Sequence, residues 1–223
     1  MFKILHNLGL GDHIICNGMV RFLAHSLGSV GVFCKMENTA FIRRMYTGDE
    51  ETIRVIPVFG DKQVEILKPD LDVRSYGEGF DQEMYRKAGM PFSLRWTAFR
   101  DGFYPAPLHA LKEVFGVAPN MSYKVAAFWC SEGRYPLPPD LENDPSVIRV
   151  RQRKDRTLED WVELASGASE IHCVDSAFFN LMQSRRFRPS IHLWKYRTTP
   201  TPTLGEGVIV HLPPDPRPVP VKD

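Results

Sequence analysis

Residues 2–15, FKILHNLGLGDHII, constrain the fold of this chain more than any other stretch. Residues 2–5 form a short apolar run of the kind found in buried parallel strands. Gly9 and Gly11 permit a tight turn, and the following residues predict a helix from about 12 to 27. Such a turn places backbone N–H groups at the carboxyl edge of a sheet, where ligands bind in open α/β folds.

The rest of the chain continues to alternate strand and helix, which predicts an α/β protein with parallel sheets. The run 116–120 (GVAPN) is the candidate boundary between two Rossmann-like lobes. We expect a first lobe at 1–118 and a reduced second lobe at 119–212, because a loop with four prolines (131–145) replaces its first crossover helix. Residues 213–223 are proline-rich and predict a flexible tail.

Composition excludes several classes of protein. The 223 residues are 43% hydrophobic and 25% charged with a net charge of +1, so no bulk attraction to nucleic acid is expected. No run of about 18 apolar residues predicts a membrane span. The cysteines are too widely spaced for a typical zinc site and predict free thiols in a reducing, cytoplasmic compartment; they are Cys16, Cys34, Cys130 and Cys173.

Two interpretations of the first turn remain open. Asp12 could cap the helix N-terminus, or it could act as a general base at the mouth of a cleft. The Gly9-x-Gly11 pair also resembles a dinucleotide fingerprint, but Ile14 stands where a third glycine is needed. A nicotinamide- or flavin-dependent oxidoreductase is therefore the less favoured reading.

A second strand–turn–helix pattern ends in Asp175-Ser176, where a sugar hydroxyl or a phosphate could bind at the helix N-terminus. The alternative is again a helix cap. The basic side chains at the end of the strand at 147–150 and just after it are either a solvated face or a clamp for a diphosphate, to which arginine forks are suited. This group contains Arg149, Arg151 and Arg153, with Arg134 from the proline loop as a further candidate.

Asp70 and Asp72 have the DxD spacing of many metal-dependent sugar transferases. Because the pair precedes its strand instead of closing one, a turn is the favoured interpretation. No histidine pair has tight metal-ligand spacing along the sequence, and no metal site is predicted.

Two segments resemble the ADP-heptose:lipopolysaccharide heptosyltransferase family. Residues 7–14 (NLGLGDHI) resemble its amino-terminal glycine–aspartate loop, and residues 157–176 (TLEDWVELASGASEIHCVDS) resemble its carboxyl-terminal block. The second segment is about as similar to fucosyltransferases of related two-lobed fold. The heptosyltransferase pattern continues Gly-Pro-x-His, where this chain has AFFN at 177–180, and the chain is shorter than the usual member.

The resemblance implies a GT-B type glycosyltransferase with a nucleotide-sugar donor and a glycan or glycolipid acceptor, active in polysaccharide biosynthesis. It implies that Asp12 is the base, that no metal or cofactor is needed, and that peripheral membrane association is compatible with the activity. By position, the acceptor-side loop would contain Gly9, Gly11, His13 and Asn17, and the donor would contact Asp175 and Ser176. A catalytically inactive nucleotide- or glycan-binding protein of the same fold is the main alternative.

Overall fold

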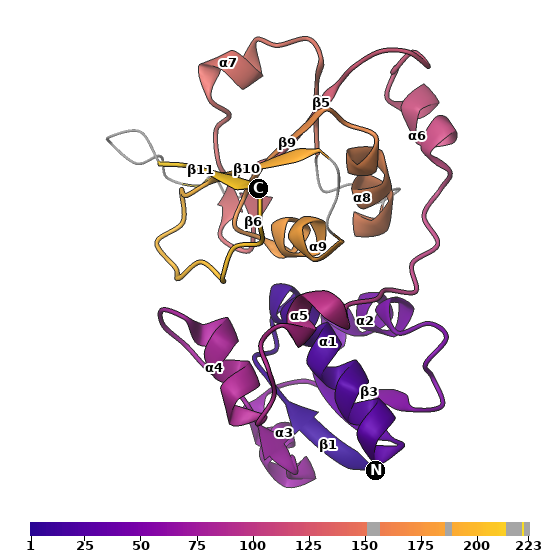
Figure 1. Ribbon diagram of the computed structural model, residues 1–223, viewed down its shortest axis with the longest axis vertical. Coiled ribbons are helices and arrows are strands. Elements are labelled where there is room, and N and C mark those ends of the chain that lie inside the picture. Colours follow the sequence, from indigo (N-terminus) through magenta and orange to yellow (C-terminus); the bar gives the residue numbers. More distant parts are fainter. Residues whose placement is uncertain (151–156, 186–188, 213–219, 221–223) are drawn as a thin grey trace. The chain divides into compact units, whose positions relative to one another are not determined.

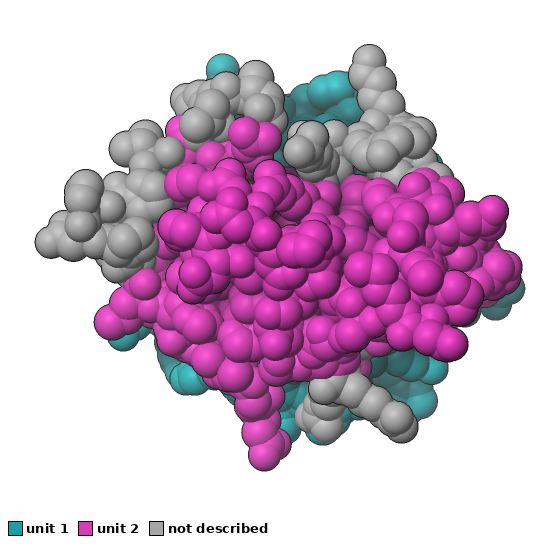
Figure 2. Space-filling model, turned by 90° about the horizontal axis from the view of Figure 1, so that it is seen from above, with its two compact units in different colours: residues 1–103, 199–203 teal, residues 104–198, 204–223 magenta. Residues whose placement is uncertain are grey.

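The computed structural model describes residues 1–150, 157–185, 189–212 and 220. The chain forms two compact units, coloured separately in Figure 2. Unit 1 contains residues 1–103 and 199–203, and unit 2 contains residues 104–198 and 204–223. This division falls earlier in the chain than the 116–120 run suggested by the sequence, and residues 199–203 return to unit 1 after most of unit 2 has formed.

Unit 1 is a four-stranded parallel sheet with the strand order β3-β2-β1-β4. Apolar side chains of the sheet pack under α3 in a cluster that includes Leu5, Phe33 and Val64. The elements of this unit are β1 (Phe2–Leu5), α1 (Leu10–Leu27), β2 (Val30–Lys35), the short 3-10 helix η1 (Met36–Asn38), α2 (Thr39–Met45), β3 (Ile53–Val58), α3 (Asp61–Leu67), β4 (Leu71–Asp72), α4 (Phe80–Lys87) and α5 (Leu94–Thr97).

Unit 2 contains a five-stranded parallel sheet with the order β11-β10-β9-β5-β8. Figure 1 shows α8 and α9 along one face of this sheet. The elements are α6 (Leu108–Val114), β5 (Lys124–Ala127), β6 (Trp129–Cys130), β7 (Gly133–Arg134), α7 (Pro139–Glu142), β8 (Val147–Arg149), α8 (Leu158–Ser166), β9 (Glu170–Val174), α9 (Ala177–Arg185), β10 (Ser190–Trp194) and β11 (Val208–His211).

The proline-rich loop at 131–145 contains more structure than the sequence predicted. β6 and β7 pair as an antiparallel hairpin, and α7 begins at Pro139, where a proline is favoured because the first helical N–H needs no partner. Leu141 of α7 packs with Phe128 and Tyr135 in an apolar cluster on the sheet face opposite α8 and α9. The loop therefore takes the place of the missing crossover helix as a cover for that face.

Each sheet has a topological switch point, where the strand order reverses. In unit 1 it lies between β1 and β4, and in unit 2 it lies between β5 and β9. Ligands of open α/β sheets bind in the crevice outside the carboxyl ends of the strands at such points. The fold thus singles out the loop after β1 and the segments after β5 and β9.

No helix among the described residues is both long and apolar enough to span a bilayer.

Candidate functional site

The first candidate site is the loop after β1, where α1 begins two residues earlier than expected. Gly9 is the N-cap residue, α1 starts at Leu10, and Asp12 therefore lies in the first turn of the helix instead of capping it. The Gly9 carbonyl accepts hydrogen bonds from the backbone N–H groups of Asp12 (3.1 Å) and His13 (3.2 Å). This corrects the expected helix start at residue 12.

The carboxylate of Asp12 folds back over Gly9. A Cβ atom added to Gly9 would lie 2.6 Å from Asp12 Oδ2, which is closer than any real Cβ contact. Asp12 is half-buried and lies at the helix end that favours negative charge. The glycine thus lets an acidic side chain occupy the carboxyl edge of the sheet at the switch point.

Asn7 fixes this loop to the neighbouring strand segment. Its Nδ2 donates to the Ser75 carbonyl (2.7 Å) and its Oδ1 accepts from the Ser75 N–H (3.2 Å). Ser75 lies three residues after the end of β4 at Asp72. The amide of Asn7 therefore closes the switch point of unit 1 just before the glycine turn.

His13 and Asn17, which were expected to face an acceptor, are both fully buried. The His13 ring packs edge-to-face on His6 at 4.3 Å. Asn17 Oδ1 accepts hydrogen bonds from Arg21 Nε (3.2 Å) and the Arg100 N–H (3.1 Å). In this conformation the two side chains support α1 from within unit 1, whereas Gly9, Gly11 and Asp12 are partly accessible.

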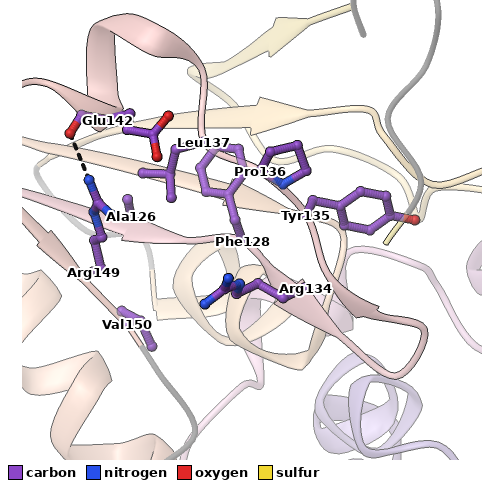
Figure 3. Close-up of a pocket in the computed structure, with 9 residues that line it drawn as sticks. All are labelled: Ala126, Phe128, Arg134, Tyr135, Pro136, Leu137, Glu142, Arg149 and Val150. Carbon is purple, nitrogen blue, oxygen red and sulfur yellow. Dashed lines mark hydrogen bonds between the residues drawn. The ribbon is translucent and has the colours of Figure 1, made fainter. Parts of the chain in front are cut away.

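The second candidate site is a pocket of about 230 Å³ in unit 2. Ala126 and Phe128 contribute from β5 and beyond its carboxyl end, and Arg149 and Val150 from the same end of β8. Figure 3 shows apolar side chains between the groups that carry charge. The complete lining is Ala126, Phe128, Arg134, Tyr135, Pro136, Leu137, Glu142, Arg149 and Val150.

Arg134 and Arg149 are brought together at this pocket, as the sequence-based grouping of the two residues required. Arg149 Nη2 donates to the Glu142 carbonyl at 2.6 Å, which fixes the guanidinium at the pocket edge. The guanidinium of Arg134 points toward the side of the pocket formed by Arg149 and Val150 in Figure 3. Two cationic forks beside apolar walls could bind an anionic ligand that also has a flat, apolar part.

A hydrogen-bonded chain joins the proline loop to the turn after β9. Tyr135 Oη donates to Glu132 Oε2 (2.8 Å), Arg197 Nε donates to Glu132 Oε1 (2.8 Å), and Arg197 Nη1 donates to the Asp175 carbonyl (3.0 Å). Burial alone would raise the pKa of Glu132, but the hydrogen bonds from Tyr135 and Arg197 bring that pKa below its ordinary value. An ionised Glu132 therefore positions both sides of the unit 2 switch point.

Sequence reasoning missed Glu132 and Arg197 because they are 65 residues apart and neither stands in a motif. It also missed Glu142, whose proximity to Arg149 depends on α7. The only local signal was that a long loop without a predicted element is often functional.

Asp175 and Ser176 are nearly inaccessible and neither lines the pocket. Ser176 Oγ accepts the Phe179 N–H (3.3 Å), so the hydroxyl caps α9 as the alternative interpretation proposed. Asp175 offers its carbonyl to Arg197, as described above. Arg151 and Arg153 lie outside the described residues.

Asp70 and Asp72 are engaged in local contacts. Asp70 Oδ2 accepts the Lys3 N–H (2.7 Å), and Asp72 binds Arg74 through both carboxylate oxygens. The pair therefore stabilises the junction of β1 and β4, in agreement with the turn interpretation.

All four cysteines are free, as their spacing predicted.

A different group of side chains could hold a metal ion. Ligand atoms of Glu170, His172 and His192 all lie within 4.8 Å of one another. Glu170 is the first residue of β9, and His172 and His192 are the central residues of β9 and β10.

Comparison with known proteins finds relatives only at the level of structure. No family model and no curated protein sequence matches the chain. The E. coli ADP-heptose lipopolysaccharide heptosyltransferase II is similar with a TM-score of 0.55 at 13% identity, covering 95% of this chain and 90% of that chain. A family 9 glycosyltransferase from Veillonella parvula is similar with a TM-score of 0.51 at 10% identity, covering 94% and 84%.

TibC from enterotoxigenic E. coli, described as an iron-containing dodecameric glycosyltransferase, is similar with a TM-score of 0.54 at 12% identity, covering 93% of this chain and 62% of TibC. These matches confirm that the chain has the two-lobed α/β fold of heptosyltransferases, as the two motifs predicted.

The expectation that no metal is involved is contradicted. A structural neighbour is described as iron-containing, and the described residues include the Glu170, His172 and His192 group. Sequence reasoning failed here because it searched for ligand spacing along the chain, whereas these side chains are neighbours across two paired strands.

Proposed function

We propose that this protein is a glycosyltransferase that moves a sugar from a nucleotide-sugar donor to a hydroxyl group of a glycan or glycolipid precursor. The main support is a combination of two observations. The chain has the fold of heptosyltransferases, and each of its sheets has a polar loop at its switch point. TibC has been described in complex with ADP-D-β-D-heptose, so an ADP-sugar is the first donor to test.

The pocket in unit 2 is the proposed donor site. Arg134 and Arg149 would bind the diphosphate, because guanidinium forks match phosphate oxygens in pairs. The apolar walls formed by Phe128 and Leu137 would pack against the base, and Glu142 would accept hydrogen bonds from hydroxyl groups. Asp175 and Ser176 would support the donor site from the turn that follows β9. Arg197 and Glu132 would hold that turn in place.

Asp12 is the proposed general base. Its carboxylate would remove the proton of the acceptor hydroxyl as that oxygen attacks the anomeric carbon of the donor. The bond from the anomeric carbon to the diphosphate then breaks, and the departing oxygen takes the electron pair while the arginines stabilise its charge. Gly9 and Gly11 would allow the acceptor to approach the backbone, with His13 and Asn17 supporting the loop from beneath.

The test combines two variants, one expected to lower sugar transfer and the other to weaken donor binding. Asp12→Asn should lower sugar transfer by about 10²–10⁴-fold, the usual contribution of a general base, while leaving nucleotide binding intact. Arg149→Ala should weaken binding of ADP and ADP-sugar, because a charge-assisted pair to the diphosphate is lost. Transfer is measured with radiolabelled donor, and binding by calorimetry.

Asp61→Asn is the matched control, because Asp61 is also an acid in the first turn of a helix of unit 1 but is 82% exposed. It should leave both transfer and binding unchanged. Transfer at wild-type rate by Asp12→Asn would refute the role of Asp12. Donor binding without any transfer by the wild-type chain would instead support the inactive binding protein.

A further inference from the structure

A row of imidazole rings crosses the sheet of unit 2 on the face opposite α8 and α9. Strands β9 and β10 are parallel with His172 directly opposite His192, and β10 and β11 pair Trp194 with His211. The alternate positions Ile171 and Leu193 point the other way and are buried. Because side chains alternate along a strand, the register places these rings side by side on one face.

The rings contact one another closely. His172 and His192 stack with 4.4 Å between ring centroids, and His192 and His211 stack at 5.2 Å. His192 Nδ1 lies 2.9 Å from His211 Nε2, and His172 Nε2 lies 2.9 Å from Glu170 Oε2. Three imidazoles and a carboxylate therefore turn nitrogen and oxygen atoms toward one another within a small volume.

The surroundings of this row hold His172 and His192 in the neutral form. Burial lowers the pKa of His172, and burial together with the charges of His172 and His211 lowers the pKa of His192. The charged groups facing the row are Glu170, whose pKa is lowered by its bond to His172, and Lys124, which lies 3.3 Å from Glu170 and 3.5 Å from Asp144. Neutral imidazole is the form that ligates metals.

We propose that Glu170, His172 and His192 bind one divalent transition-metal ion, with Zn²⁺ as the ion that fits the donor set best. Two imidazoles and one carboxylate are a recurrent zinc ligand set, with bonds of about 2.0–2.2 Å and a fourth position left for water or another ligand. The ligand atoms already lie within 4.8 Å of one another, so rotations of the three side chains would close them around an ion. His211 is placed to supply the fourth ligand or to orient His192.

This ion would join β9 and β10 away from the carboxyl ends of the strands, where the proposed donor pocket lies. The pocket is at the carboxyl ends of β5 and β8, whereas Glu170 is the first residue of β9. Zinc bound at Nε2 of His172 requires a proton on Nδ1, which now accepts a long hydrogen bond from Trp194 Nε1 (3.4 Å). Binding would therefore break that bond and change the surroundings of Trp194.

The experiment uses the full, untagged chain after dialysis against a chelator. Calorimetric titration with Zn²⁺ should give one ion per chain, and Zn²⁺ should raise the melting temperature. Co²⁺ should give the visible absorption of a tetrahedral or five-coordinate nitrogen–oxygen site. Intrinsic fluorescence should change on Zn²⁺ addition, and Trp194→Phe should abolish most of that change.

Two variants and a matched control decide the assignment. His192→Gln and the isosteric Glu170→Gln should each weaken Zn²⁺ binding by at least tenfold and remove the Zn²⁺-dependent rise in melting temperature. His109→Gln changes an exposed histidine of α6 in the same unit and should bind as the wild type does. If His192→Gln fails to fold by circular dichroism, Glu170→Gln alone decides.

The proposal is overturned if the wild-type chain shows no saturable binding of one Zn²⁺, or if Glu170→Gln binds with unchanged affinity. Neither result depends on sugar transfer, so the metal site and the proposed transferase activity fail or survive independently.

Discussion

At the scale of single residues, unit 1 buries a pair of imidazoles directly behind its candidate catalytic loop. His6 directly follows β1 and His13 lies one residue after Asp12, and both side chains are fully inaccessible. Burial lowers the pKa of His6 to about 4 and lowers the pKa of His13 well below its ordinary value. Both rings are therefore neutral in the folded protein at neutral pH, which keeps added positive charge away from Asp12.

This burial predicts acid lability. The unfolded chain takes up a proton on His6 near its ordinary pKa of 6.5, whereas the folded chain does so only near 4. The folded state therefore keeps its full stability above pH 6.5 and loses stability as the pH falls from 6.5 toward 4. For His6, this loss in the free energy of unfolding reaches about 3 kcal/mol. Urea unfolding at pH 7.5, 6, 5 and 4.5 measures the slope.

His6→Leu should flatten this pH dependence, although His13 will retain a part of it in the same direction. The control is His25→Gln, because His25 is exposed at the end of α1, and it should leave the slope unchanged. Equal slopes for wild type and His6→Leu would show that His6 is not the group responsible.

At the scale of elements, the packing of α1 against α5 fixes the first site. Gly18 lies where the two helices meet: a Cβ atom added to it would lie 2.0 Å from the Leu94 carbonyl oxygen. The adjacent residue, Asn17, accepts the N–H of Arg100, so α1 also holds the segment that follows α5. A glycine inside a helix normally costs stability, so its presence here reflects the close approach of the backbones.

Gly18→Ala should therefore destabilise the protein despite the higher helix propensity of alanine. Propensity favours alanine by about 1 kcal/mol, but the backbone of α5 must move, and overpacking of this kind costs about 1–3 kcal/mol or more. We expect a net loss of about 2 kcal/mol in the free energy of unfolding, measured by urea denaturation. Gly60→Ala is the control, because its added methyl group meets nothing within 4 Å; a loss as large there would remove the packing explanation.

How far the sequence predicts these elements depends on the range of the interactions that form them. The strand–glycine–helix pattern around Gly9 and the capped start of α9 at Ser176 are local, and both could be predicted from residue type. The pocket could be predicted only in part: Arg134 and Arg149 were grouped, but Glu142 reaches them through α7. The Glu132–Arg197 pair and the His172–His192 stack depend on tertiary contacts and strand register, which leave no spacing signal along the chain.

At the scale of the whole molecule, the chain crosses between its units more than once. After β10, residues 199–203 join unit 1 before the chain returns to form β11. Thr203 is bound there by the carboxylate of Asp81, through its N–H (2.7 Å) and its hydroxyl (3.1 Å), while its carbonyl accepts from Arg95 Nη1 (3.0 Å). Asp81 and Arg95 form a fully buried ion pair, so unit 1 is completed by a segment from the far end of the sequence.

Asp81→Asn should therefore release this crossing segment as well as weaken unit 1. Removing one charge from a buried pair leaves the Arg95 guanidinium poorly compensated and costs about 3–5 kcal/mol. Glu83→Gln breaks the Arg86 pair on the surface of the same helix, where solvent screens the charges, and should leave the free energy of unfolding nearly unchanged. Amide hydrogen exchange should accelerate at residues 199–203 in Asp81→Asn and not in Glu83→Gln. Unchanged exchange at 199–203 would mean that the buried pair stabilises α4 and α5 without anchoring the crossing segment.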